Sequence, residues 1–269
     1  MELRQITDLR AEADELHRLL APLAPGEWDR ATQFKGWTVN DIMQHLHMGD
    51  VMALSSAIDP VSYDALVADV QARRAGGMSR LVETRDRLNG LSGPALLAQW
   101  RARLDTLCDR LATMDPGARL KWSGPGMGLR MFATARQMET WAHGQAIYDL
   151  LGVERPPASA RLRNIVEIGV RTFGWAFRNR GLAVPAAAPN IRLEGPGGEI
   201  WEWPSSSPDE TISGDAIAFC QVVTQTRNVG DTSLRVTGPT ARHWMGIAQC
   251  FAGPPETPPP PGTRCRVLA

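Results

Sequence analysis

The spacing of the hydrophobic residues changes near residue 190, and this change limits the folds open to the chain. From residue 6 to about residue 181, apolar side chains recur three and four positions apart, as in amphipathic helices. Between residues 191 and 203 they alternate on either side of a glycine-rich turn, which predicts a β-hairpin. We therefore expect an α+β protein, with a four-helix bundle first and a small α+β unit with an antiparallel sheet after it.

Breaks in these patterns divide the chain into three segments. We expect the helical bundle over residues 1–155, the α+β domain over residues 156–253, and a proline-rich tail, extended or mobile, over residues 254–269. The predicted helices cover residues 6–20, 60–76, 78–91, 95–114, 131–150, 159–181, 214–226 and 239–251, with another that begins at Thr38. The predicted strands cover residues 191–194, 199–203, 211–212 and 233–237.

Charge and cysteine content exclude several classes of protein. Lys plus Arg and Asp plus Glu number 29 each, so the chain lacks the excess positive charge with which proteins bind nucleic acid. The four cysteines form no Cys-x-x-Cys pair, which argues against a zinc ribbon or a disulfide framework. No apolar run is long enough to span a membrane, and the N-terminus does not resemble a signal peptide. We expect a cytoplasmic protein with a small-molecule substrate, and its oligomeric state stays open.

Glu139 and His143 are the strongest candidates for chemistry. They are four residues apart in a predicted helix, so both side chains lie on one face, one turn apart. A carboxylate and an imidazole presented in this way can bind a divalent metal ion, as ligands on facing helices of bundles do. Such pairs also occur on solvated helix faces, so the pair alone leaves both interpretations open.

His45 is the best candidate for a further ligand. Its helix begins with a capping-box pattern from Thr38 to Asp41, and His45 shares an apolar face with Ile42 and Leu46. Asp41 lies one turn before His45 and could accept the imidazole N–H, as carboxylates do for metal-bound histidines. His47 points about 200° away around the same helix, so it is a weaker candidate.

Two further features lie near this pattern. Arg136 precedes Glu139 by three residues and so lies near the same helix face, where it is a candidate for binding a substrate. Residues 121–128 form a glycine-rich stretch that lacks the Lys-Ser/Thr ending of a phosphate-binding loop. This stretch either shapes the rim of a pocket or is a plain connection.

These motifs resemble a known superfamily. Residues 36–39 with His45-Leu46, and residues 139–144, are similar to the motifs of the DinB-like metal-binding superfamily, in its mycothiol-dependent maleylpyruvate isomerase branch. The resemblance covers most of the chain and is closest to an uncharacterised actinobacterial subfamily. It implies an N-terminal four-helix bundle, an α+β C-terminal domain, and metal ligands at His45, Glu139 and His143. The part after residue 180 also faintly resembles a domain associated with tRNA modification, which no basic stripe supports.

The resemblance implies a divalent metal ion, with zinc expected first and nickel, iron or manganese as alternatives. It also suggests mycothiol as a thiol cofactor, held as the nucleophilic thiolate. Our first hypothesis is thus a metal-dependent isomerase or S-transferase in which Arg136 and Asp41 assist. The alternatives are a metal-dependent hydrolase or lyase-like enzyme without a thiol, a non-catalytic metal-binding protein, and a tRNA-associated factor.

Overall fold

The computed structural model describes residues 3–122, 124–156 and 160–267. The chain separates into two compact units, Met1–Ile147 and Tyr148–Ala269, and each is described by itself. The domain boundary expected near residue 155 lies a few residues beyond this division. The division into domains stays a prediction.

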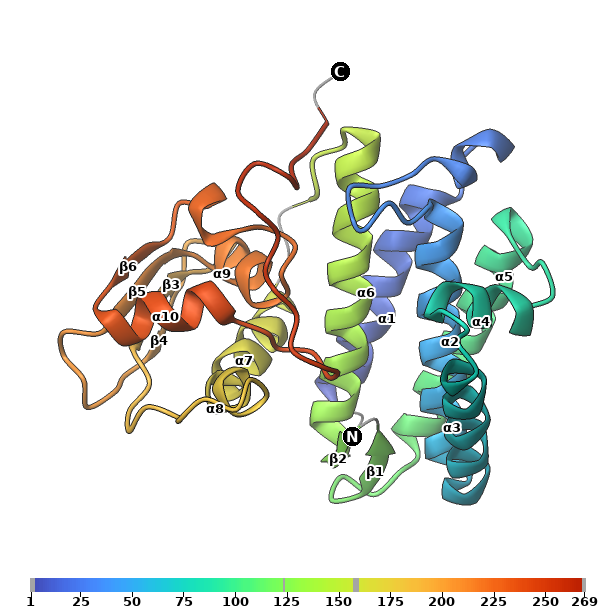
Figure 1. Ribbon diagram of the computed structural model, residues 1–269, viewed down its shortest axis with the longest axis horizontal. Coiled ribbons are helices and arrows are strands. Elements are labelled where there is room, and N and C mark those ends of the chain that lie inside the picture. The colour runs from blue at the N-terminus through green and yellow to red at the C-terminus, as the bar shows by residue number, and fades with distance from the viewer. Residues whose placement is uncertain (1–2, 123, 157–159, 268–269) are drawn as a thin grey trace. The chain divides into compact units, whose positions relative to one another are not determined.

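The first unit is helical, as its hydrophobic spacing predicts, and four long helices form the predicted bundle: α1, α2, α5 and α6 (Figure 1). Observed and predicted helix ends agree to within a few residues. In chain order the helices are α1 (Arg4–Leu20), the short 3₁₀ helix η1 (Pro25–Asp29), α2 (Val39–Ile58), α3 (Pro60–Ala75), α4 (Arg80–Arg87), α5 (Gly93–Ala112) and α6 (Leu129–Leu151).

Helix α2 begins where its capping box predicts. The Thr38 hydroxyl accepts a hydrogen bond from the Asp41 backbone N–H at 3.1 Å, and the Asp41 carboxylate accepts one from the Thr38 N–H at 3.0 Å. These two bonds satisfy backbone donors that a helix start otherwise leaves unpaired. They fix the first residue of α2 and with it the face on which His45 lies.

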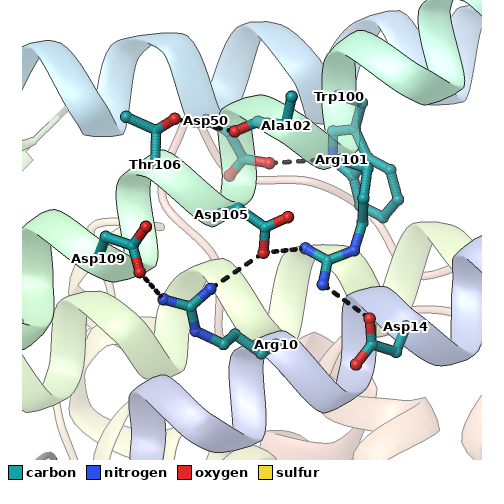
Figure 2. Close-up of polar contacts among 9 residues, drawn as sticks. All are labelled: Arg10, Asp14, Asp50, Trp100, Arg101, Ala102, Asp105, Thr106 and Asp109. Atoms are coloured by element: carbon teal, nitrogen blue, oxygen red, sulfur yellow. Dashed lines mark hydrogen bonds and ion pairs between the residues drawn. The ribbon is translucent and has the colours of Figure 1, made fainter.

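Ion pairs join α1 to α5 on the outside of the bundle (Figure 2). Arg10 pairs with Asp105 at 3.0 Å, and Arg101 pairs with Asp14 at 2.7 Å. Between the helices lies a core of apolar side chains that includes the fully buried Trp100. Because partly exposed ion pairs contribute little free energy, burial of this core is what holds the bundle together.

The glycine-rich stretch before α6 forms a β-hairpin, which the sequence analysis did not predict. Strand β1 (Arg119–Trp122) pairs antiparallel with β2 (Gly124–Gly128), and the register shifts between Leu120 and Trp122. Strand β2 has almost no side chains that could alternate between two faces, so the pattern on which strand prediction depends is missing. The hairpin leads directly into α6.

The second unit contains a four-stranded sheet in the order β4-β3-β5-β6. The predicted hairpin is confirmed, but β3 pairs parallel with β5, so the sheet is mixed rather than wholly antiparallel. A connection that passes through β4 brings β5 to the other edge of β3, and hydrophobic alternation carries no information about strand direction. The strands are β3 (Asn190–Glu194), β4 (Ile200–Trp203), β5 (Thr211–Asp215) and β6 (Arg235–Thr237).

The helices of the second unit differ from prediction in two places. The helix expected over residues 159–181 is two helices that meet at Thr172, whose hydroxyl donates to the Ile168 carbonyl at 2.7 Å; residue 159 lies outside the described residues. The strand expected over residues 211–212 extends to Asp215, which also caps the helix that it was expected to open. The helices are α7 (Leu162–Arg171), α8 (Phe173–Arg178), α9 (Ala216–Val223), the 3₁₀ helix η2 (Val229–Asp231) and α10 (Pro239–Ile247).

The proline-rich tail is extended, as expected, but it is tied to its own unit by hydrogen bonds. Asn228 donates to the Pro259 carbonyl at 2.8 Å, and Gln225 donates to the Glu256 carbonyl at 2.9 Å. Pro259 is buried. These bonds come from side chains far from the tail in sequence, so its proline content alone could not predict them.

Candidate metal centre

Glu139 and His143 lie one turn apart on α6, as their spacing requires. The Nε2 atom of His143 is 3.4 Å from the Oε2 atom of Glu139. The side chain of His143 is 12% exposed and that of Glu139 is 23% exposed, so the pair is mostly enclosed rather than part of a solvated helix face. The interpretation as a solvated face, which the sequence left open, does not describe this pair.

Helix α2 brings His45 to the same place. Its Nε2 atom lies 3.5 Å from the same Glu139 oxygen, and its ring centroid is 4.5 Å from that of His143. One ligand atom from each of the three side chains lies within 4.8 Å of the other two. The structure thus groups the three residues that the sequence analysis named as metal ligands.

The spacing and chemistry of this group fit one divalent ion. Nitrogen and carboxylate ligands bind zinc at about 2.0–2.2 Å, so the ligand atoms of one tetrahedral ion are roughly 3–4 Å apart. Both Nε2 atoms already face one carboxylate oxygen at such distances. The Nδ1 atom of His143 is buried without a hydrogen-bond partner among the described residues, whereas its Nε2 atom faces the Glu139 carboxylate.

Burial and neighbouring charges set the protonation of the group. Burial lowers the pKa of His45 to about 4, and the positive charges of His143 and Arg80 act in the same direction. Burial by itself raises the pKa of Glu139, but hydrogen bonds with His143 and His45 hold that pKa well below its ordinary value. At neutral pH the group therefore offers an unprotonated imidazole and a carboxylate, which are the forms that bind metals.

Two aromatic rings wall the group on one side. Trp37 stacks parallel to the His143 ring, with 6.0 Å between centroids and 3° between planes, and it meets the His45 ring edge-on. Phe34 contacts His143 edge-on at 5.0 Å. The turn that presents both rings contains Lys35 and Gly36 in the left-handed backbone region. Trp37 belongs to a motif that carries the family resemblance, but nothing in the sequence alone places its ring in the site.

Arg136 lies close to the site, but its side chain is committed to another partner. Its guanidinium is buried and donates from Nε to the Asp50 carboxylate at 2.9 Å. It also faces the Trp122 ring, 5.7 Å from the centroid. A side chain that is 3% exposed and already paired is not available to bind a substrate, so the suggested substrate role does not fit its surroundings.

Asp41 is committed elsewhere as well. Besides capping α2, its carboxylate accepts hydrogen bonds from Arg85 at 2.8 and 2.9 Å. Among the described residues, no hydrogen bond joins it to the His45 ring, so the support suggested for His45 is not observed. Asp41 instead fixes the helix start and joins it to α4.

His47 faces away from the group, as its helical position predicts. It is 5% exposed, and its Nδ1 atom has no hydrogen-bond partner in the described part of the chain. Burial lowers its pKa to about 4, and the charge of Arg103 acts in the same direction. His47 is therefore a neutral residue of the bundle interior.

A cavity of about 570 Å³ opens at the start of α2, next to α4 and α5. It is lined by polar residues, including Asp41, Gln44 and Arg85. Of the residues described, none of the three candidate ligands lines it. The cavity and the metal group are therefore separate features of the bundle.

A model of the family described as the mycothiol maleylpyruvate isomerase N-terminal domain matches residues 9–148. The chain belongs to this family. Two uncharacterised proteins, from two strains of Mycobacterium tuberculosis, are each 38% identical to it over 250 residues, which cover 93% of this chain and 96% of the relative. The family's matched region contains all three candidate ligands.

Two crystal structures of mycothiol-dependent maleylpyruvate isomerase share the fold. One of them is a variant in which a histidine is replaced by alanine. Each superposes with a TM-score of 0.53 at 14% identity, over 94% of this chain and 95% of the other. At this identity the likeness shows the fold alone. Among the described residues, none of the helices combines the length and apolar character that crossing a bilayer requires.

Proposed function

We propose that this protein is a divalent-metal-dependent enzyme that uses a thiol, mycothiol first, in an isomerase or S-transferase reaction on a small molecule. The observation that carries the proposal is the group of His45, Glu139 and His143, whose ligand atoms lie within 4.8 Å of one another. Support comes from membership of a family whose name includes mycothiol and maleylpyruvate isomerase.

Each residue of the site has a role in this proposal. His45, Glu139 and His143 hold the ion, with zinc as the first choice for two imidazoles and one carboxylate. Three protein ligands leave a coordination position open, which is typical of catalytic rather than structural sites. When bound there, the ion supplies a Lewis acid that keeps a thiol in its thiolate form.

The aromatic side chains limit access to the site. Trp37 and Phe34 pack on the His143 ring and restrict water on that side, so a ligand approaches from elsewhere. Exclusion of water strengthens electrostatic interactions within such a site. The two rings also hold the imidazole plane in one orientation, which preserves the direction of its Nε2 lone pair.

Arg80 is the candidate for attracting an anionic substrate to the site. It is exposed at the first residue of α4, and its charge is close enough to lower the pKa of His45. Among the described residues no ion pair with a carboxylate involves Arg80. A positive charge without a carboxylate partner beside a metal group favours a substrate that carries a carboxylate.

Metal analysis and thiol titration test this function. Protein loaded in turn with zinc, nickel, iron and manganese should retain about one ion per chain after desalting. Calorimetric titration of the loaded protein with mycothiol should show saturable binding that the metal-free protein lacks. Absence of bound metal under every loading condition would refute the site. Metal binding without thiol binding would instead favour a hydrolase or lyase-like enzyme, or a non-catalytic metal-binding protein.

A further inference from the structure

A second polar cluster lies inside the bundle beside the metal group, and Asp50 is its centre. The Asp50 side chain is 0% exposed. One carboxylate oxygen accepts from Arg136 of α6 at 2.9 Å, and the other accepts from the Trp100 indole of α5 at 3.0 Å. Asp50 itself belongs to α2, so one carboxylate joins three helices that are far apart in sequence.

This cluster and the metal group form neighbouring layers between α2 and α6. On α2, Asp50 follows His45 by five residues, which is about 7.5 Å along the axis; on α6, Arg136 precedes Glu139 by three residues, about 4.5 Å. The order of the contacts is reversed between the two helices, so α2 and α6 run antiparallel. The Asp50–Arg136 pair is thus the contact between these helices one turn away from the ligands.

The backbone of α2 is adapted to hold the Arg136 guanidinium. A Cβ atom at Gly49 would lie 2.7 Å from the Nη2 atom of Arg136, closer than real contacts allow. Nη2 also donates to the Leu46 carbonyl at 3.4 Å. Gly49 therefore provides the space in which the guanidinium rests on α2.

A buried ion pair is a poor source of stability, because each charge loses its hydration and the attraction between them rarely repays that loss by much. Burial raises the pKa of Asp50, against the opposing effects of Arg136 and Trp100, which shows how unfavourable the surroundings are for a charge. Apolar side chains would fill the same volume without this cost. The pair instead favours one register of α2 against α6, because the guanidinium and the carboxylate meet with good hydrogen-bond geometry only in that register.

We propose that Asp50 and Arg136 are positioning residues that fix the register of α2 against α6, and thereby hold His45 at the distance from Glu139 that metal binding requires. The inference rests on the proposed metal function. Residues that orient metal ligands from outside the coordination sphere typically change metal affinity roughly 10–100-fold when they are mutated.

The test replaces the ion pair by apolar residues of similar shape. The Asp50→Leu/Arg136→Met variant leaves no unpaired charge, but the buried Trp100 indole N–H loses its acceptor, so the variant should fold with a lower melting temperature than the wild type. Its affinity for zinc should fall roughly 10–100-fold. Its cobalt-loaded form should show shifted visible absorption bands, because these report the geometry of the ligands. A role in stability alone would lower the melting temperature and leave both the zinc affinity and the cobalt spectrum unchanged.

A matched control removes an ion pair from the outside of the same bundle. The Asp14→Leu/Arg101→Met variant removes the Arg101–Asp14 pair between α1 and α5 shown in Figure 2, keeps the Arg10–Asp105 pair, and should leave zinc affinity and the cobalt spectrum unchanged. If the apolar double variant at Asp50 and Arg136 fails to fold, Arg136→Lys gives a second comparison, since it keeps a positive charge for Asp50 but loses the planar donor geometry of the guanidinium.

Crystal structures of the metal-free wild type and variant separate the two proposals. The distance between the Nε2 atom of His45 and the Oε2 atom of Glu139 is 3.5 Å in the wild type, and it should differ from this value in the variant. If the wild type binds no metal, the proposed function fails, but this distance still tests the positioning role. Wild-type zinc affinity, cobalt spectrum and ligand spacing in the folded variant would overturn the inference.

Discussion

The Nε2 atom of His45 lies 3.5 Å from the Oε2 atom of Glu139, although the two residues are 94 positions apart in sequence. His45 belongs to α2 and Glu139 to α6, so the contact exists only when the bundle has formed. The same Glu139 oxygen faces His143. One carboxylate oxygen between two imidazoles is thus the centre of the candidate metal site.

The two histidines of α2 should differ in their effect on metal binding. We predict that His45→Ala abolishes stoichiometric binding, because it removes one of three ligands, whereas His47→Ala retains it. The free energy of unfolding should fall more in His47→Ala than in His45→Ala. His47 is 5% exposed, so its replacement leaves a space in the interior, at a cost of roughly 1–3 kcal/mol. Metal content and chemical denaturation of both variants provide the measurements. Loss of metal in His47→Ala with retention in His45→Ala would show that the third ligand is wrong.

Replacing Gly49 by alanine should destabilise the protein, against the usual preference of helices. Alanine favours a helix interior by about 1 kcal/mol relative to glycine. Here its methyl group would meet the Arg136 guanidinium at 2.7 Å, and the buried Asp50 carboxylate holds that guanidinium in place, so the overpacking should cost roughly 1–3 kcal/mol. We expect a net loss of stability in urea denaturation.

The same substitution should reverse its sign when Arg136 is absent. In an Arg136→Ala background the methyl group meets no guanidinium, so Gly49→Ala should stabilise the protein by up to about 1 kcal/mol. A double-mutant cycle measures this coupling directly. If Gly49→Ala changes the free energy of unfolding equally in the two backgrounds, the coupling free energy between positions 49 and 136 is zero and the prediction is wrong.

Arg80 should affect anionic substrates selectively. On the proposed function, we predict that Arg80→Gln raises KM for a substrate that carries a carboxylate and leaves the affinity for zinc nearly unchanged. Salt should raise KM of the wild type more than that of the variant, because the charge lost in the variant is exposed and therefore screened. Steady-state kinetics at several ionic strengths would decide, and an identical salt dependence in both proteins would exclude the role.

The cysteines should differ sharply in reactivity. Cys265 is exposed, whereas Cys108, Cys220 and Cys250 are buried. Burial raises the pKa of Cys108 from its ordinary 9.0 to about 12, so its thiol stays protonated at pH 8. Iodoacetamide should therefore add one group to the native protein, at Cys265, as peptide mass spectrometry can show. Rapid labelling of Cys108 in the native protein would contradict this.

The same pKa shift gives a prediction for alkaline pH. Between pH 9 and 12 the thiol of Cys108 loses its proton in the unfolded chain but keeps it in the folded one. The folded state then binds more protons, so stability falls as pH rises through this range. Denaturation curves from pH 8 to 11 should show a smaller fall for Cys108→Ala than for the wild type.

Local sequence was enough to predict most helices and the placement of Glu139 and His143 on one helix face. Thr38 and Asp41 form a capping pattern that is visible in four residues, and Glu139 and His143 share a face by spacing alone. The choice of His45 over His47 needed the family resemblance as well, because both histidines have apolar neighbours on α2. Whether the three residues bind a metal ion stays a prediction.

The remaining features depend on contacts that no local pattern encodes. The commitment of Arg136 to Asp50 follows from the packing of α2 against α6, and its guanidinium fits only because residue 49 lacks a side chain. The parallel pairing of β3 with β5 depends on the path of the chain rather than on alternation. The hairpin before α6 is built partly from glycines, which have no side chains to show either the helical or the alternating spacing of apolar residues.

An ion held by His45 and Glu139 would have a consequence for the denatured chain. It would close a loop between positions 94 residues apart, as a disulfide does, but with a bond that a chelator can open. In the chain-entropy model, a covalent cross-link around a loop of about this length stabilises the folded state by about 4–5 kcal/mol. The intervening helices α3, α4 and α5 would then share in this tethering, although none of them supplies a ligand.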